Sequence, residues 1–355
     1  MDILDTIRAT FVEAGIKLVA IASPYSIFSY VGALVVFGVM LTITHRRLPR
    51  WRAFMKNAFP KRIFGHESTS ADIRLFILNF LVLSSAYGLA IASTEFWSAW
   101  TTNGLKAAFG AYHLSVPAWA VLVITTFAEI IMIDLGYWFG HYLMHRVPTL
   151  WEFHKVHHSA EVMTPLTEWR QHPVEMVLIP NTISLANGAT YGALNFLFGD
   201  AQPLTLWQSN ILLVIFFLTI SHLRHSHVWL PFTGLLGHLL HSPAHHQIHH
   251  SVAPQHHDKN LGFALSVWDW LFGTLWIPRE GERVTLGIGA ESPEFHKLSG
   301  SLIGPFVKAA RQAMPGEEKP VEAPLARGFK VAPEPPPGSV RATVSTDRRS
   351  GRARA

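Results

Sequence analysis

The stretch PAWAVLVITTFAEIIMIDLGYWFGHYLMHR, Pro117 to Arg146, joins a membrane-spanning pattern directly to a pair of histidines. Within it, Val116–Trp138 is apolar apart from two acidic residues, and a bilayer crossing takes about 20 such residues. The pattern continues without a break to His141 and His145, so it predicts one long helix that protrudes from the membrane. Histidines spaced i and i+4 lie on the same face of such a helix.

The composition favours a membrane protein for the whole chain. Of its 355 residues, 49% are hydrophobic and 15% are charged, and the mean hydropathy is +0.23, whereas a soluble domain usually carries about 25% charged residues. Four further apolar stretches carry no charge: Ser26–Thr44, Leu75–Thr94, Met176–Gly199 and Leu204–Ser221. We therefore predict an all-α integral membrane protein with about four to five transmembrane or embedded helices and a cytoplasmic, His-rich helical cap.

The basic residues predict how the chain is oriented. The segment His45–Arg62, HRRLPRWRAFMKNAFPKR, carries seven Lys and Arg residues and no acidic residue, which is typical of a cytoplasmic loop. Counted from this loop, the chain returns to the cytoplasm after Val116–Trp138 and again after the hairpin of the last two apolar stretches. All the histidine-rich segments are then expected on the same face of the membrane.

We expect three regions along the chain. Residues 1–70 hold an N-terminal membrane helix and the basic loop, residues 71–285 form the membrane domain with the histidines, and residues 286–355 form a polar, Pro- and Arg-rich tail that is largely disordered. The N-terminus lacks a basic region and a cleavage site, so no removable signal peptide is expected. The absence of cysteine excludes disulfides, iron–sulfur clusters and thiolate zinc sites.

Histidine is concentrated in the middle of the sequence, where 17 of the 21 lie between His141 and His257. Four clusters stand out: HYLMH (His141, His145), HKVHH (His154, His157, His158), SHLRHSH (His222, His225, His227) and HHQIHH (His245, His246, His249, His250). Spacings of three and four residues group the rings on one helical face. Neutral imidazole is a good ligand for iron, copper and zinc, so the clusters indicate a metal site with more than one ion.

Polar residues near these rings are candidates for supporting contacts. A carboxylate can orient an imidazole through its second ring N–H and offset the charge of the metal. The candidates are Asp134, Glu168, His172, Glu175, His245, Asp258, Asn260 and Asp269. Glu129, inside an apolar stretch, is a further candidate for a hydrogen-bonding role because an ionisable residue in a membrane is costly.

At these residues the sequence resembles the membrane fatty acid hydroxylase / sterol desaturase superfamily. The resemblance rests on the order H-x-x-x-H, H-x-x-H-H, H-x-x-H-H and on three longer stretches: DLGYWFGHYLMH (Asp134–His145), WEFHKVHHSAEVMTPLTEWRQHPVE (Trp151–Glu175) and SPAHHQIHHSVAPQHHDKNLGFALSVWDWLFGTLW (Ser242–Trp276). It covers residues 70 to 280 approximately. The elements DKNLG and WDWLFGT are similar to the bacterial, alkylglycerol-monooxygenase-like branch.

The resemblance implies a catalytic domain with two iron ions that uses O2 to hydroxylate a C–H bond of a membrane lipid. That lipid would be a sterol, a fatty acyl chain, an alkylglycerol or a related molecule. Carried over to this chain, the metal ligands would be His141, His145, His154, His157, His158, His222, His225, His246, His249 and His250. The choice among His222, His225 and His227 stays open, because the family usually fixes one or two histidines there.

The resemblance also implies a separate electron-transfer protein of the ferredoxin or cytochrome b5 type, and a place in the bacterial inner membrane. Three alternatives remain at this point. A lipid desaturase would use the same scaffold, a metal transporter would place its ligands near the middle of the membrane, and a haem protein would need far fewer histidines. Nucleic-acid binding is not indicated, because the net charge of +5 is concentrated in the basic loop and the tail.

Overall fold

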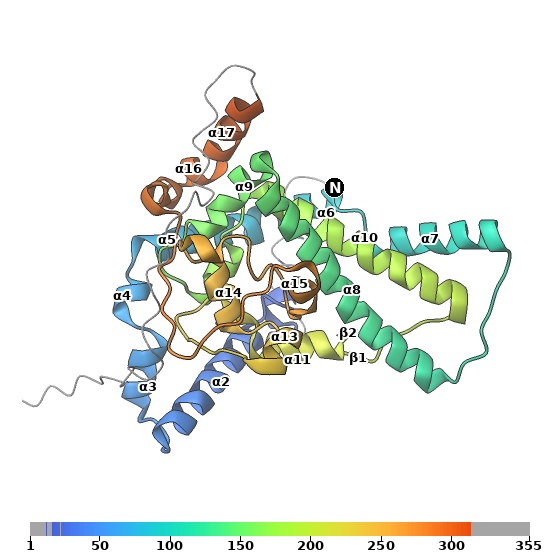
Figure 1. Ribbon diagram of the computed structural model, residues 1–355, viewed down its shortest axis with the longest axis horizontal. Coiled ribbons are helices and arrows are strands. Elements are labelled where there is room, and N and C mark those ends of the chain that lie inside the picture. Colours follow the sequence, from blue (N-terminus) through green and yellow to red (C-terminus); the bar gives the residue numbers. More distant parts are fainter. Residues whose placement is uncertain (1–11, 13–15, 22, 314–355) are drawn as a thin grey trace, which may run out of the picture. The chain divides into compact units, whose positions relative to one another are not determined.

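The computed structural model describes residue 12, residues 16–21 and residues 23–313. The chain divides into two compact units, Met1–Lys319 and Pro320–Ala355, and the second unit lies outside the described residues. The described part is mostly helical (Figure 1). Its two strands, β1 (Thr205–Leu206) and β2 (Ser209–Asn210), form a small antiparallel hairpin. The all-α prediction is therefore confirmed.

Helix α8 (Ala118–Arg146) is the long helix that the stretch after Pro117 predicts. Its 29 residues make it about 44 Å long, so it exceeds the hydrocarbon thickness of about 30 Å. Helix α2 (Ile27–His45) corresponds to the first predicted span, and the Ser26 side chain caps it by accepting a hydrogen bond from Phe28 N. Both helices are long and apolar enough to cross a membrane.

The predicted span Leu75–Thr94 is broken in the structure. Four shorter elements take its place: α5 (Glu67–Ile77), a π-helical turn (Leu78–Leu83), α6 (Ser84–Ala90) and α7 (Thr94–Phe109). They could form a third span only with a bend of 67°. Asn181 stabilises the break, since its Oδ1 accepts a hydrogen bond from Ala92 N and its Nδ2 donates one to Ala90 O. A side chain thus satisfies the backbone groups that the missing helical turn leaves free.

Helix α10 (Pro173–Phe198) packs against both α8 and α7 (Figure 1). A Cβ atom added to Gly136 of α8 would lie 2.6 Å from Ile183 Cα of α10, and one added to Gly188 of α10 would lie 2.6 Å from the Thr94 carbonyl oxygen of α7. At these positions only the hydrogen atom of a glycine fits, and a methyl group would clash with the facing helix. Glycines therefore permit the close approach of these helices, as is common in membrane bundles.

The remaining two predicted spans differ from a simple hairpin of crossing helices. Helix α11 (Ile211–Thr219) has nine residues, well short of the length that a bilayer crossing requires. Helix α10 is longer, but Asn181, Asn187 and Asn195 interrupt its apolar pattern. Among the described residues two helices, or three with the bent pair, thus meet the requirements of length and composition, and the count of four to five stays a prediction.

Shorter helices bring the histidine-rich segments together. They are α3 (Trp51–Ala58), α4 (Lys61–Phe64), α9 (Pro148–His158), α12 (Ser221–Arg224), α13 (Gly234–Leu239), α14 (Pro243–His249) and α15 (Val267–Phe272), with 3-10 turns at Pro165–Trp169 and Pro254–His256. Helix α9 contacts the end of α8, and α14 contacts α12. Segments that lie up to about a hundred residues apart in the sequence are thereby joined into one assembly.

The predicted tail begins too early at residue 286. A 3-10 helix (Gly289–His296), α16 (Leu298–Leu302) and α17 (Gly304–Ala313) follow, and α17 packs against α9. Phe295 is fully buried in a cluster with Leu75 and Val156, and Arg74 Nη2 donates a hydrogen bond to His296 O at 2.7 Å. A few apolar anchors suffice to order this segment, although its composition is polar. The rest of the predicted tail, residues 314–355, lies outside the described residues.

Candidate metal centre

Nine buried or nearly buried histidines converge in two groups. In each group one ring nitrogen of every member lies within 4.8 Å of those of all the others. Group one consists of His141, His145, His154, His158 and His249, and group two of His157, His225, His246 and His250. The structure thus brings together nine of the ten histidines that the sequence predicts as ligands.

The ring nitrogens face one another at short distances. In group one, His154 Nε2 lies 3.0 Å from His141 Nε2 and 3.1 Å from His158 Nε2. In group two, His225 Nε2 lies 2.7 Å from His246 Nε2 and 3.3 Å from the Nε2 of His250. Two nitrogens bound at right angles to one ion, each about 2.1 Å away, would be about 3 Å apart. The spacing therefore fits ligation of a common ion in each group.

Helix geometry divides each H-x-x-H-H motif between the two groups. Helix α9 begins with Pro148, whose fixed φ suits the first helical position, and it sends His154 and His158 to group one but His157 to group two. Helix α14 begins with Pro243 and contributes in the same way to both groups. Consecutive residues such as His157 and His158 point about 100° apart around the helix axis, so each helix can supply ligands to both groups.

Three predicted carboxylates lie against the outward nitrogens of these rings. Glu168 Oε2 is 2.7 Å from His225 Nδ1, and Glu175 Oε2 is 3.1 Å from His154 Nδ1. The third, Asp258, lies 3.3 Å from His145 Nδ1. The contact of Glu168 is a hydrogen bond, and a carboxylate in this position fixes the proton on Nδ1 and leaves Nε2 free to bind a metal.

Burial and neighbouring groups act on the pKa values of Glu168 and Glu175 in opposite ways. Burial alone would raise the pKa of Glu168, but the adjacent imidazole of His225 and the positive charge of Arg224 hold that pKa below its usual range. Burial raises the pKa of Glu175 well above its usual value, although the hydrogen bond from Gln171 lowers it in part. A cation at group one would help to keep this carboxyl group ionised.

Two backbone carbonyl groups complete the contacts to the rings. His141 Nδ1 lies 2.8 Å from Leu261 O, and His249 Nδ1 lies 2.8 Å from Lys259 O. Asp258 and Asn260 both have a φ of 56°, a left-handed conformation that Asp and Asn tolerate better than most residues. The turn at residues 258–260 thereby directs these carbonyl groups towards the rings.

Asp134 and Asp269 hold the same loop in place and do not contact the rings. Asp134 Oδ2 accepts hydrogen bonds from Ala264 N at 2.6 Å and Leu265 N at 2.9 Å. Asp269 accepts hydrogen bonds from the backbone N–H groups of Leu261 and Gly262, both at 2.8 Å, and from Trp138 and Thr274 side chains. Both predicted residues therefore support the centre through the backbone.

The other predicted supporting residues also have structural contacts. Asn260 Nδ2 donates to His245 O and to Trp276 O, while the His245 side chain takes part in the N-terminal cap of α14 with Ser242. The His172 side chain caps α10 by accepting a hydrogen bond from Val174 N. These residues fix the ends of the elements around the centre.

The state of the rings suits metal binding. Burial, together with neighbouring imidazoles, lowers the pKa of His154, His158, His246 and His250 well below the usual value. Neutral imidazole is the form that binds metal ions. In addition, the Nε2 atoms of His145 and His249 are buried and have no hydrogen-bond partner within the described part of the chain. Buried polar atoms without a partner are costly, so an ion at this position would satisfy them.

The predicted ligand His222 lies outside both groups. Its ring stacks on Tyr30 of α2, with ring centroids 3.9 Å apart, and burial lowers its pKa to about 4. His227 Nε2 instead contacts Asn57 O at 2.8 Å, near the end of α3. Of the three histidines in SHLRHSH, the structure therefore brings His225 alone into a group.

Arg224, which the sequence patterns do not single out as a functional residue, is fully buried beside group two. Its Nη2 lies 3.1 Å from His246 Nδ1 and donates a hydrogen bond to Gly262 O at 3.4 Å, and its guanidinium lies over the Phe263 ring. Its Nε and Nη1 have no hydrogen-bond partner among the described residues. The only signal in the sequence was its place within the third histidine cluster.

The fold and the two groups define a class: a helical protein with membrane-capable helices and a buried centre lined by histidines. Residues 126–274 match the family described as fatty acid hydroxylase. This match supports the resemblance to the fatty acid hydroxylase / sterol desaturase superfamily that the motifs predict. No solved structure matches it.

Several characterised proteins are similar to this chain. Alkylglycerol monooxygenase from Danio rerio is 29% identical over 156 residues, which cover 44% of this chain and 31% of the relative. Ornithine lipid hydroxylase OlsE from Rhizobium tropici is 28% identical over 193 residues, covering 54% of this chain and 53% of the relative. Human alkylglycerol monooxygenase is 27% identical over 166 residues, covering 46% and 33%. The chain thus spans between 31% and 53% of the length of these relatives.

Proposed function

We propose that this chain is an oxygen-dependent diiron oxidoreductase that hydroxylates a C–H bond of a membrane lipid. The observation that carries the proposal is the pair of adjoining groups of five and four histidines. It is supported by the match to the fatty acid hydroxylase family and by relatives named as lipid hydroxylases or monooxygenases.

In this proposal each group of histidines holds one iron ion. Bound iron would supply the activation of molecular oxygen that the attack on an unactivated C–H bond requires. The protein's own contribution is positioning: Glu168 holds the ring proton of His225 on Nδ1, and the loop at residues 259–265 fixes His141 and His249. The burial of the ligands excludes water and so protects the site from side reactions.

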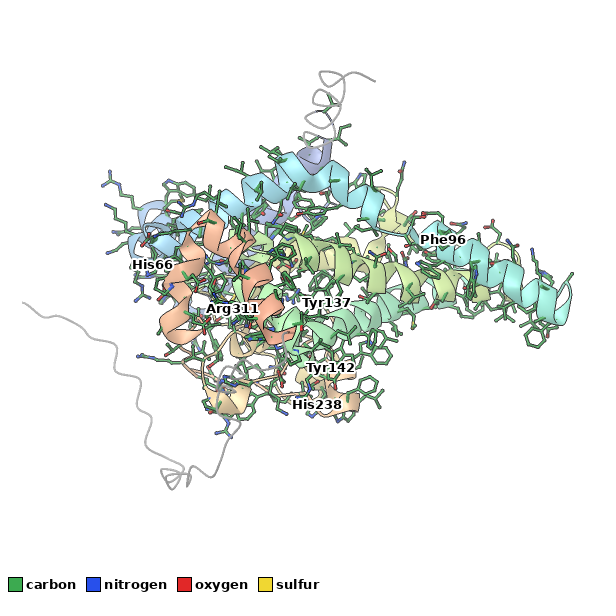
Figure 2. The ribbon with its side chains drawn as sticks, turned by 90° about the horizontal axis from the view of Figure 1, so that it is seen from above. His66, Phe96, Tyr137, Tyr142, His238 and Arg311 are labelled. Carbon is green, nitrogen blue, oxygen red and sulfur yellow. The ribbon has the colours of Figure 1, made fainter. Side chains whose placement is uncertain are left out.

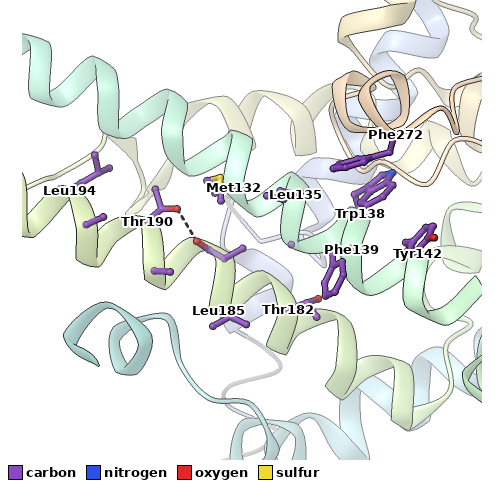
Figure 3. A pocket seen from close by; sticks show the side chains of 14 residues that line it. Met132, Leu135, Trp138, Phe139, Tyr142, Thr182, Leu185, Thr190, Leu194 and Phe272 are labelled. Atoms are coloured by element: carbon purple, nitrogen blue, oxygen red, sulfur yellow. Dashed lines mark hydrogen bonds between the residues drawn. The ribbon is translucent and has the colours of Figure 1, made fainter. Parts of the chain in front are cut away.

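An apolar groove supports a lipid as the substrate. It has a volume of about 860 Å³ and lies between α8 and α10, with Trp138, Phe139 and Tyr142 on one wall and Leu185 and Leu194 on the other (Figure 3). Trp138 and Tyr142 each precede a group-one histidine of α8 by three residues. A hydrocarbon chain in this groove would therefore lie about one helical turn from the ligands.

We further propose that the protein resides in the bacterial inner membrane with its histidines on the cytoplasmic side. The basic segment His45–Arg62 supports this orientation, because positively charged loops remain in the cytoplasm. The electrons would come from a separate protein of the ferredoxin or cytochrome b5 type.

A comparison of lipids tests the proposed reaction. Mass spectrometry would compare the lipids of three strains: one that lacks the gene, the same strain with the gene restored, and one that carries the His154→Ala variant. Hydroxylation adds the mass of one oxygen atom to a lipid, whereas desaturation removes the mass of two hydrogens. We expect the oxygenated lipid only with the intact chain, and a product that has lost hydrogen would instead establish a desaturase.

The iron content of the purified protein tests the metal ligands independently of the substrate. His154→Ala should lower the iron bound per chain, because His154 lies close to two other ring nitrogens. A matched His113→Ala variant should keep full iron content, since His113 is exposed and outside both groups. Normal iron loading in His154→Ala would contradict the assignment of His154 as a ligand.

A further inference from the structure

We propose that α13 and α15 form a membrane-embedded face that lies in the leaflet nearest the histidines, beside α8. Both helices follow the last predicted span, Leu204–Ser221, in the sequence. It rests on the proposed function only in treating α8 as a membrane span. The partner of this face is the hydrocarbon of the bilayer.

The face consists of large apolar side chains that are exposed in the structure. Its main members are Leu235, Leu236, Leu239, Trp270, Leu271 and Phe272, with exposed fractions between 40% and 70%. Helices α13 and α15 contact each other, so these side chains belong to one surface. An exposed apolar patch of this kind on a protein marks a binding surface for a partner or a membrane.

Two polar side chains within the face, Asp269 and His238, have internal partners. Asp269, the acidic residue of α15, is fully buried and accepts hydrogen bonds from two backbone N–H groups and two side chains. His238 Nδ1 lies 2.8 Å from Gly234 O, and its ring lies against Trp270 (Figure 2 labels His238). Hydrocarbon offers no hydrogen bonds, so a membrane-embedded surface requires such internal satisfaction.

Contacts with α8 set the depth of the face. Trp268 Nε1 donates a hydrogen bond to Ile131 O at 3.2 Å, and Phe272 stacks on Trp138 with ring centroids 4.5 Å apart. Ile131 lies near the middle of α8, about 15 Å along the helix axis before His141. Helix α15 therefore lies beside the part of α8 that the bilayer must surround if α8 crosses it.

The face is also continuous with other apolar surfaces. Phe272 belongs both to the face and to the groove between α8 and α10 (Figure 3). Phe127 and Phe139 of α8 are about half exposed as well. The bilayer would cover the face, the groove and the exposed side chains of α8 at once. A separate protein partner would instead have to displace lipid from the groove.

The depth of spin labels tests the proposal. The chain contains no cysteine, so single cysteines can be introduced at Leu236 and Leu271 and labelled with a nitroxide in nanodiscs that hold one chain each. Phe127→Cys on α8 serves as the lipid-facing reference, and Glu280→Cys, at an exposed loop position, serves as the aqueous reference. Collision with O2, which concentrates in lipid, is compared with collision with a water-soluble nickel complex.

We expect the labels at positions 236 and 271 to favour O2 over the nickel complex, as at position 127, and the label at 280 to show the reverse. A preference for the nickel complex at 236 and 271 would overturn the proposal. So would protection from both reagents, which would indicate protein cover. The measurement needs neither iron nor turnover, so its outcome is distinguishable from a failure of the proposed lipid oxidation.

Discussion

The imidazole of His225 is held from two sides. On its outer side Glu168 Oε2 lies 2.7 Å from Nδ1, and on its inner side the Nε2 atom faces those of His157, His246 and His250 at 2.7 to 3.3 Å. The carboxylate thereby determines which nitrogen of the ring is available to an ion.

Replacing Glu168 with Gln should weaken metal binding. An amide oxygen can still accept a hydrogen bond from Nδ1, but the negative charge that offsets the ion is lost, and such outer contacts typically change metal affinity by about 10- to 100-fold. The affinity can be measured by competition with a chelator. Glu282→Gln is a suitable control, because Glu282 lies near His256 and outside both groups. Equal affinities for the two variants would show that the charge of Glu168 is unimportant.

At the level of residues, the sequence predicted the histidine ligands better than the groups that contact their rings. The spacing of histidines on helical faces depends on local geometry, and nine of the ten predicted ligands converge. The contacts from Leu261 O and Lys259 O were not predictable, since any residue carries a carbonyl group. The stacking of His222 on Tyr30 depends on how α2 packs against α12, and local patterns do not encode that contact.

Close contact between helices α8 and α10 depends on residues without side chains. A Cβ atom on Gly136 would approach backbone atoms of Thr182 and Ile183, and backbone cannot move aside as a flexible side chain can. This contact positions the segment of α8 that leads to His141. Packing at the level of helices thus determines the geometry of the centre.

Gly136→Ala should therefore lower the thermal stability of the purified protein, even though alanine favours helix by up to about 1 kcal/mol over glycine. Gly104→Ala on α7 is the matched control, because a Cβ atom there would meet no neighbouring atom, and this variant should be neutral or stabilising. The melting temperatures in detergent give the comparison. A Gly136→Ala variant as stable as Gly104→Ala would mean that α8 and α10 can separate without cost.

A buried ion pair joins four elements near α9. Arg170 Nη1 lies 3.0 Å from Asp72 Oδ1, and both side chains are completely buried. Arg170 also donates hydrogen bonds to Val156 O, Ser159 Oγ and Phe295 O. The pair thus connects α5, the 3-10 turn Pro165–Trp169 that precedes Arg170, α9, and the 3-10 helix Gly289–His296.

Asp72→Asn should destabilise the protein strongly, since removing one partner of a buried pair costs about 3 to 5 kcal/mol. The free energy of unfolding can be measured by denaturant titration in detergent. Glu294→Gln removes an exposed partner of Lys308 and should cost less than about 1 kcal/mol. Similar losses in the two variants would contradict a structural role for the buried pair.

Elements governed by local pattern were predicted well, and elements governed by distant contacts were not. Helix α8 follows from its apolar run and from Pro117, and the structure reproduces its expected end at Arg146. The break in the predicted span Leu75–Thr94 depends on Asn181, which lies about ninety residues further along the chain. The order of residues 289–313 likewise depends on Phe295, whose burial requires the surface of α5 and α9.

For the molecule as a whole, the collected imidazoles predict a dependence of stability on pH. Burial lowers the pKa of rings such as His154, His157 and His246 in the folded state, whereas in the unfolded chain it is about 6.5. Between these values the unfolded chain binds more protons, so stability falls as the pH decreases. The metal-free protein should melt at a constant temperature above a pH of about 7 and at progressively lower temperatures below about 6.5. A melting temperature that rises on acidification would exclude this account.

Each H-x-x-H-H helix, α9 and α14, sends rings to both groups. If each group holds one ion, as proposed, the first ion immobilises the same two helices that the second ion needs, and the entropy of ordering them is lost only once. Loading should consequently be cooperative: a titration with ferrous ion should yield a Hill coefficient above one, and chains with a single ion should be scarce in native mass spectra. Two independent, equal binding steps would show instead that the helices are already rigid before any iron arrives.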